Sequence, residues 1–491
     1  MNPVYAGVLA AIVVILLSVS ASRLRMTRTK ADYLVAGRSL PAFVLVFTLL
    51  SSWIGSGSLL GGAENAYNHG FAALWQAAGG WAGLALIYFI APRARKFAQF
   101  TIPDLLEARY NQTARVLGVI AVLFTYTAIS SYQLIGGGDI LHLVFPSTIS
   151  PNMGKYLIAG FVVLFTAIAG MSSVAYMDVA IGILATVTLL LSLPFLLHRA
   201  GGWHGVHMAL PATHFQVLGD FSLIQALELF LPTMLLMLGN QSMYQKFFSA
   251  KSEKDARHAV VGWVIGTIIL ETVIVSIAVV ASTIFTTGEV RQHPREIIAY
   301  TALHGLPEWL GPLLMGAVFA KIISTANNYL FSPATNLVND VFARYIAPRA
   351  TDRTTLAVSR IMIVMLGLWA LYQALHTQSV LQKTLYAYTI YSAALTPVIL
   401  AAFYSRRANA AGAISAIGIG TIVTVFWDTD FIHHHLPPVL AQRDAIFPAL
   451  IAAVLGLVVV SAFTRPPTRQ QLAPFFPALE TVNEDEVEGM P

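Results

Sequence analysis

The sequence contains no cysteine, and charged residues make up only 11% of its 491 positions. The lack of thiols excludes disulfides, thiolate metal sites and cysteine nucleophiles. A soluble protein of this length would have about a quarter charged residues, whereas here 56% of the residues are apolar and the mean hydropathy is +0.69. These values indicate an integral membrane protein, in which lipid replaces water around much of the chain.

Apolar runs long enough to cross a bilayer as helices recur along the whole chain. We predict an all-α protein with about thirteen transmembrane helices, centred near residues 12, 52, 82, 128, 163, 187, 235, 271, 320, 367, 392, 417 and 455. The formal net charge of +5 comes from basic residues in short blocks between these runs, a pattern that orients membrane helices. The charge therefore reflects topology, and we predict no nucleic-acid partner.

The basic residues are divided unequally between the two sets of loops. If the run from Pro3 to Ser22 is an uncleaved anchor, the loops of one side hold 22 of the 29 Lys and Arg residues and the opposite loops hold six. The segment from Lys246 to Arg257 is counted among the basic loops. Because basic loops stay in the cytoplasm, we predict a multi-pass protein of the inner (plasma) membrane. Its N-terminus lies outside, and its acidic C-terminal tail is cytoplasmic and disordered.

Two apolar runs contain residues that interrupt helices. Residues 51–62 alternate serine with glycine, and the run near 235 begins Leu231-Pro232-Thr233 and ends Gly239-Asn240-Gln241. Unwound backbone at this depth binds a solute or ion in transporters, although small residues also permit close helix packing.

Five spans separate the two interruptions, which predicts two five-helix repeats that each open with a broken helix. The expected segments are a first helix with a basic loop at 1–40, repeats at 41–200 and 220–405, two further helices at 406–465 and a tail at 466–491.

A third polar island lies in the run near residue 320. Lys321, Ser324 and Thr325 are spaced i, i+3 and i+4, so they share one face of a helix. A carbonyl and two hydroxyls there form a cluster of hard oxygens that suits a cation such as sodium. Serine and threonine in membrane helices also commonly bond back to their own helix, so both interpretations stay open.

Several motifs in order resemble the sodium:solute symporter family, from about residue 31 to 465. They are DYLVAGRSL at 32–40, IPDLLEARY at 102–110, YMD at 176–178, YQKFFSAK at 244–251, Ser324-Thr325 and RRAN at 406–409. The resemblance implies a LeuT-type 5+5 inverted repeat with a broken first helix in each repeat. It also implies symport of a small polar organic solute with sodium as the coupling ion and no organic cofactor.

The family resemblance also implies particular site residues. Carried over by position, the sodium ligands are backbone carbonyls of Ser51, Ile54 and Lys321 and the hydroxyls of Ser324 and Thr325, and Asp178 lies on the sodium exit path.

Lys321 departs from the family, which usually has a small residue at this position. An ammonium group there would repel sodium, so its side chain either pairs with an acid or replaces the cation. Asp178 and Glu271 are the candidate partners. If the lysine replaces the ion, the chain is a sodium-independent or proton-coupled transporter, since buried lysines shift their pKa readily.

The solute pocket is predicted at the two interruptions. Trp53 stands where the choline-transporter branch of the family has a cation-binding tryptophan, but Asn240 replaces the second tryptophan of that branch. The pocket candidates are Trp53, Ser56, Ser58, Gln76, Gln133, Asn240 and Tyr388, with Tyr386 and Tyr391 in the same stripe. His433–His435 form an outer loop that is either solvated or a fortuitous metal site.

Other function classes have less support in the sequence. A membrane sensor with a fused kinase would need more than the roughly 25 residues that follow the last span. An enzyme is not expected, because no zinc-ligand motif, nucleophile elbow or phosphate loop is present. We therefore predict a secondary transporter whose partners are a small solute and the lipid bilayer.

Overall fold

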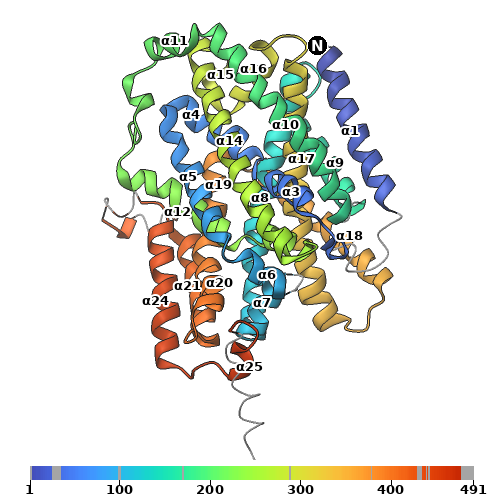
Figure 1. Ribbon diagram of the computed structural model, residues 1–491, viewed down its shortest axis with the longest axis vertical. Helices are drawn as coiled ribbons and strands as arrows, with labels where there is room; N and C mark the ends of the chain where they lie inside the picture. Colours follow the sequence, from blue (N-terminus) through green and yellow to red (C-terminus); the bar gives the residue numbers. More distant parts are fainter. Residues whose placement is uncertain are drawn as a thin grey trace, which may run out of the picture.

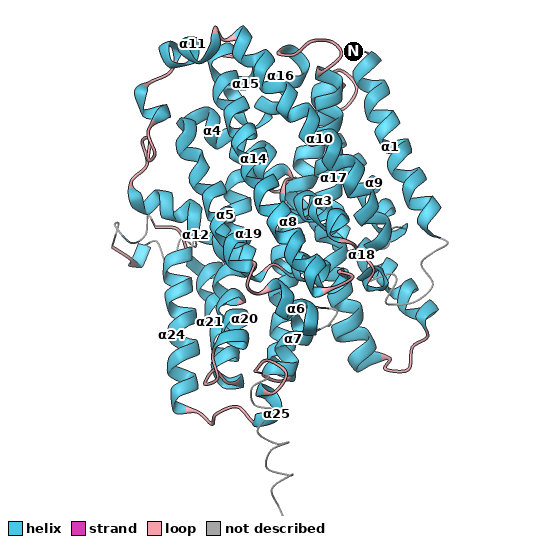
Figure 2. Ribbon diagram, viewed as in Figure 1, coloured by secondary structure: helices cyan, strands magenta, loops and turns pink. Residues whose placement is uncertain are grey.

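The computed structural model describes residues 3–24, 35–97, 101–168, 171–286, 289–377, 379–427 and 443–476, with 429, 434–437 and 440. Within these ranges the chain forms helices joined by loops and contains no strand (Figure 2). The predicted all-α fold is confirmed. Asp32, His433 and the acidic tail lie outside the described residues.

The first half of the chain contains α1 (Pro3–Leu24), η1 (Ala36–Arg38), α3 (Ala42–Trp53), η2 (Gly57–Gly62), α4 (Ala63–His69), η3 (Gly70–Ala73), α5 (Leu74–Ile87), α6 (Ala91–Phe97), α7 (Ile102–Arg109), α8 (Gln112–Val144), α9 (Pro151–Ile168), α10 (Met171–Arg199), α11 (Gly202–Ala209) and η4 (Ala212–Phe215). The second half contains α12 (Leu223–Gly239), α13 (Gln241–Ser249), α14 (Glu253–Ile284), α15 (Glu289–Gln292), η5 (Pro294–Glu296), α16 (Ile297–His304), α17 (Gly311–Asn336), η6 (Leu337–Ile346), α18 (Asp352–Leu375), α19 (Val380–Ala394), α20 (Thr396–Tyr404), α21 (Ala410–Trp427), α24 (Ile446–Phe463) and α25 (Arg469–Leu472).

Each of the thirteen predicted centres falls inside one of these helices. Ten segments are long and apolar enough to cross a bilayer, and two shorter apolar helices begin at Pro3 and Ala42. The chain is therefore a multi-pass membrane protein, while the number thirteen stays a prediction.

The helices form one bundle with peripheral elements at its two edges (Figure 1). Helix α1 packs against α10 and α17, and α21 and α24 pair with each other and contact α19. The N-terminus and α25 lie at opposite ends of the molecule in Figure 1. An odd number of crossings requires such an arrangement.

Both predicted helix breaks are present, the first at Ile54 and the second at Asn240. Helix α3 ends at Trp53, and Ile54 is extended (φ −81°, ψ 97°) before η2 begins. Helix α12 ends at Gly239, and Asn240 (φ −58°, ψ 114°) separates it from α13. Pro232 lies inside α12, so the second break occurs only at Asn240.

Candidate functional site

The first helix break is held against α17 by a threonine hydroxyl. The Thr325 Oγ1 atom lies 2.8 Å from the Ser51 carbonyl oxygen, 3.3 Å from that of Ile54 and 2.9 Å from that of Lys321. The carbonyls of Ser51 and Ile54 point at α17 because the helix ends near Trp53 and leaves them without helical partners. The structure thus brings together, in the buried core, four of the five predicted ligand oxygens.

Ser324, the fifth predicted ligand residue, turns its hydroxyl toward Asp178. The Ser324 hydroxyl donates to one carboxylate oxygen of Asp178, and Thr48 Oγ1 donates to the other at 2.5 Å. Asp178 is fully buried in α10. A carboxylate therefore lies directly behind the oxygen cluster, where it can attract a cation.

Lys321 lies in the same region, and its ammonium group faces the first break. Its Nζ atom donates to Ser51 Oγ at 3.0 Å, and the side chain is 1% exposed. The Asp178 carboxylate is near enough to attract this ammonium, although the two groups form no ion pair in the described part of the chain. Glu271, the other predicted partner of Lys321, bonds to different residues.

Glu271 lines a small cavity next to the first break. The lining residues are Trp53, Ser58, Gly62, Ala73, Gln76, Ala77, Glu271, Ile274, Val275 and Tyr388. Four of the predicted pocket residues (Trp53, Ser58, Gln76 and Tyr388) are therefore adjacent to one another. The rings of Trp53 and Tyr388 are stacked, with centroids 5.8 Å apart.

The other pocket candidates lie outside this lining. Gln133 Oε1 accepts from the Ser56 backbone N–H at 2.7 Å, which supports the unwound backbone of the first break. At the second break, Asn240 Oδ1 accepts from Tyr126 at 2.8 Å and Asn240 Nδ2 donates to Tyr329 at 3.0 Å. Solute contact by Ser56, Gln133 and Asn240 stays a prediction.

Two residues near the site could not be recognised in the sequence. Trp81 in α5 donates from Nε1 to Glu271 Oε2 at 3.0 Å. Lys246 was counted among the basic residues of a loop, but it is fully buried in α13, where Nζ donates to Asn328 Oδ1 at 2.8 Å and to Ser242 Oγ at 3.2 Å. The one available signal for Lys246 is the run of aromatic residues around it.

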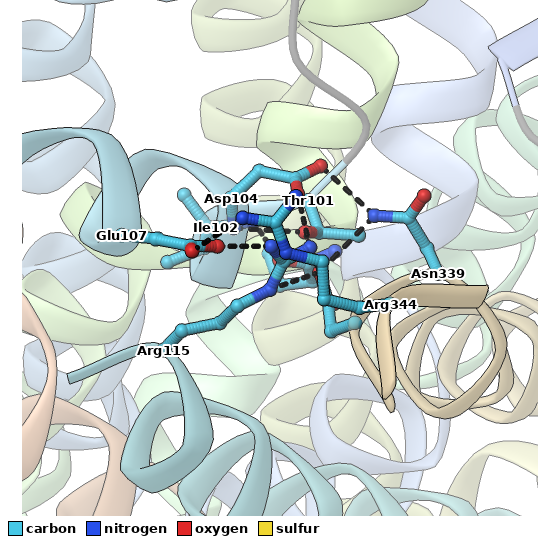
Figure 3. Close-up of polar contacts among 9 residues, drawn as sticks. Thr101, Ile102, Asp104, Glu107, Arg115, Asn339 and Arg344 are labelled. Carbon is cyan, nitrogen blue, oxygen red and sulfur yellow. Dashed lines mark hydrogen bonds and ion pairs between the residues drawn. The ribbon is translucent and has the colours of Figure 1, made fainter. Parts of the chain in front are cut away.

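A network of charges at one end of the bundle joins α7, α8 and η6 (Figure 3). Arg115 pairs with Asp104, Glu107 and Asp340, and Arg344 donates to Glu107 at 2.8 Å. Since η6 continues directly from α17, the network connects the helix that carries Thr325 to the α7–α8 region.

The second break is joined to the same network. Gln241, the first residue of α13, accepts from the Ile102 backbone N–H at 2.5 Å through its side-chain oxygen. Burial alone would raise the pKa of the Glu107 carboxyl, but hydrogen bonds and charge from Arg115 and Arg344 hold that pKa below its usual range. The Glu107 carboxyl is therefore ionised near neutral pH.

Comparison with known proteins gives one family over most of the chain. The model of the sodium:solute symporter family matches residues 33–420. The osmoregulated proline transporter OpuE of Bacillus subtilis is 24% identical over 457 residues, which are 89% of this chain and 90% of that protein. A sodium/proline symporter of Staphylococcus aureus is 24% identical over 471 residues, 90% of this chain and 89% of the relative.

Solved transporter structures share the arrangement of helices. A Na⁺-coupled sialic acid symporter in a substrate-bound outward-open state matches with a TM-score of 0.79 and 16% identity, over 95% of this chain and 99% of that chain. Mhp1, a nucleobase-cation-symport-1 family transporter, matches with a TM-score of 0.60 and 12% identity, over 91% and 99%. At sequence identities this low, the similarity shows a shared fold and nothing further.

Proposed function

The chain belongs to the sodium:solute symporter family, and from that premise we propose that it carries a small polar organic solute into the cell with sodium bound between α3 and α17. It is a membrane transporter of the LeuT-type inverted-repeat fold and not an enzyme. Its partners are the solute and the lipid bilayer. The proline of the relatives named above is a solute of this class.

The observation that supports the sodium site best is the convergence of oxygens at the first break. Three backbone carbonyls lie 2.8–3.3 Å from the Thr325 hydroxyl oxygen, and the Ser324 hydroxyl is one residue away. Neutral hard oxygens replace the hydration shell of an alkali cation. The buried Asp178 carboxylate adds the negative charge that compensates the ion, and we place it on the path by which sodium leaves.

Transport follows if one repeat moves against the other around this site. In folds with inverted repeats, the solute and ion sites lie at the repeat interface near the middle of the bilayer. We propose repeats at residues 41–200 and 220–405, with the N-terminus outside and the C-terminus in the cytoplasm. The unequal division of basic loops supports this orientation.

Substitution of the threonine hydroxyl tests the sodium site. Thr325→Val keeps the shape of the side chain but removes an oxygen, so we expect it to raise the sodium concentration for half-maximal uptake about tenfold or more. Thr188→Val in α10 is the matched control, because Thr188 Oγ1 bonds to carbonyls of its own helix. An unchanged sodium requirement in Thr325→Val would exclude this site.

A second mechanism has a specific observation in its favour, namely the ammonium of Lys321 at Ser51 Oγ. In this sodium-independent or proton-coupled mechanism, the lysine charge takes the place of the ion. Two unit charges about 4 Å apart repel by about 4 kcal/mol at an effective dielectric constant near 20, which is enough to exclude sodium unless the ammonium moves or loses its proton.

Lys321→Ala distinguishes the two mechanisms. If sodium is the coupling ion, the variant keeps sodium-driven uptake, and its sodium affinity rises because a repulsive charge is gone. If the lysine replaces sodium, the wild type ignores sodium and the variant either stops or acquires a sodium requirement. Uptake by both proteins across a sodium titration is the measurement.

A further inference from the structure

The cavity beside the first helix break contains a buried acid that has no cationic partner among the described residues. The exposed fraction of Glu271 is 5%, and no described lysine, arginine or histidine forms an ion pair with its carboxylate. A carboxylate removed from water is costly unless an opposite charge or several donors compensate it. When Glu271 is ionised, a cation from outside the described residues can compensate its charge.

The protein supplies three hydrogen bonds to this carboxylate, which are fewer than it can accept. Glu271 Oε1 accepts from Trp53 Nε1 at 2.8 Å and from Ser58 Oγ at 3.3 Å, and Oε2 accepts from Trp81 Nε1 at 3.0 Å. An ionised carboxylate has about four acceptor positions. One position therefore stays open on Oε2, at the cavity that Glu271 lines.

The same cavity is lined by another acceptor, the side-chain oxygen of Gln76, which has no hydrogen-bond donor among the described residues. Gln76 is 8% exposed. A buried polar atom without a partner is unfavourable in the protein alone. Gln76 and Glu271 thus present acceptor oxygens that a donor group of a bound molecule can satisfy.

Aromatic faces complete the environment of these acceptors. Trp53 and Tyr388 line the cavity as a stacked pair, and such faces attract cations through the negative charge of their ring systems. The remaining lining residues are small or aliphatic and carry no positive charge. The space inside the cavity is about 20 Å³, which is room for one water-sized polar group, so a whole solute requires the helices around the cavity to move apart.

We infer that the transported solute carries a protonated amine, whose N–H groups bind Glu271 Oε2 and the Gln76 oxygen while its charge lies against Trp53 and Tyr388. A primary or secondary amine satisfies both acceptors, whereas a quaternary ammonium has no N–H to donate. The inference rests on the proposed function, since it defines the substrate class of the same transporter. Glu271 then acts as the solute-binding acid and not as the partner of Lys321.

Thermal unfolding of the purified protein in sodium tests this inference with compounds matched in shape. The probes are L-proline against cyclopentanecarboxylate, pyrrolidine against cyclopentanol, and ethanolamine against choline, with glucose as a nitrogen-free solute. We expect at least one N–H amine to raise the Tm in a saturable way and its partner to have little effect. Stabilisation by a nitrogen-free compound, by choline alone, or by none of the amines contradicts the inference.

The substitution Glu271→Gln then tests whether Glu271 is the residue that binds the amine. The variant loses the charge and keeps an acceptor oxygen for only one of the two indole N–H groups, so the affinity for the stabilising amine should fall about ten- to a hundredfold. Glu228→Gln in α12 is the control, because Glu228 lies near Arg443 and Asp444 and does not line this cavity. Equal affinity in wild type and Glu271→Gln overturns the assignment, and the Tm of the ligand-free variant shows whether it folds.

Uptake into proteoliposomes separates a failure of this inference from a failure of the proposed function. A nitrogen-free solute carried with sodium leaves the proposed function intact and refutes the amine. An amine that binds through Glu271 but is carried without sodium supports the inference and refutes the coupling.

Discussion

Gly55 occupies the narrowest position at the first helix break. A Cβ atom at this residue would lie 2.7 Å from Thr325 Oγ1 and 2.8 Å from Gln133 Oε1. Both distances are shorter than a carbon–oxygen contact allows, so any side chain would push α17 or α8 away from the unwound segment. The glycine therefore permits the approach on which the oxygen cluster depends.

Gly55→Ala should abolish sodium-dependent uptake while the protein still folds, because overpacking by a methyl group costs about 1–3 kcal/mol. Gly160→Ala in α9 is the control, since a Cβ there meets nothing within 4 Å. Uptake by reconstituted protein and the Tm in detergent are measured together. A Gly55→Ala variant with the wild-type rate and sodium requirement would show that the close contact has no role in transport.

At the residue scale, the sequence predicted several of the residues that meet at the first break but not how the charged side chains pair. Ser51, Ile54, Lys321 and Thr325 meet as the spacing and the family resemblance suggested. The interpretation of Lys246 as a loop charge was wrong, because after the second break α13 continues the span that α12 begins and buries the lysine. Periodicity along one helix does not show which distant helix its polar face contacts.

At the element scale, the breaks in α3 and α12 were recognisable because serine, glycine and asparagine are unusual within apolar runs. The position of the second break could not be derived from proline alone, since Pro232 is accommodated inside α12 and the backbone separates at Asn240. The network of α7, α8 and η6 was also not predicted, because Asp340 and Arg344 are far along the sequence from Asp104, Glu107 and Arg115.

That network supplies a test of how firmly the end of α17 is held. The Arg115 side chain is 5% exposed and the Asp340 side chain is fully buried. Removing one partner of a buried ion pair costs about 3–5 kcal/mol, so Arg115→Met should lower the Tm strongly. Arg344→Met is the matched control, because the Arg344 side chain is 55% exposed and such pairs contribute about 0–1 kcal/mol. Equal losses of Tm would mean that the network does not hold η6.

At the scale of the whole molecule, the predicted orientation in the membrane is simple to check. Because the sequence contains no cysteine, a single introduced cysteine is the one site that a thiol reagent can label. Ala212 and Lys251 are both exposed, in loops that we assign to opposite sides. An impermeant maleimide added to intact cells should label Ala212→Cys but label Lys251→Cys only after permeabilisation. The reverse pattern would invert the topology derived from the basic loops.

Sodium coupling is the central claim, and it is tested most directly by solute uptake into sealed proteoliposomes. The wild-type protein is given the amine that stabilises it most, with an inward sodium gradient or with potassium in its place. We expect the solute to accumulate transiently above its external concentration with sodium, and accumulation to vanish when sodium is equal on both sides. Uptake that is the same in potassium and in sodium would contradict sodium coupling. It would favour the mechanism in which the Lys321 ammonium takes the place of the ion.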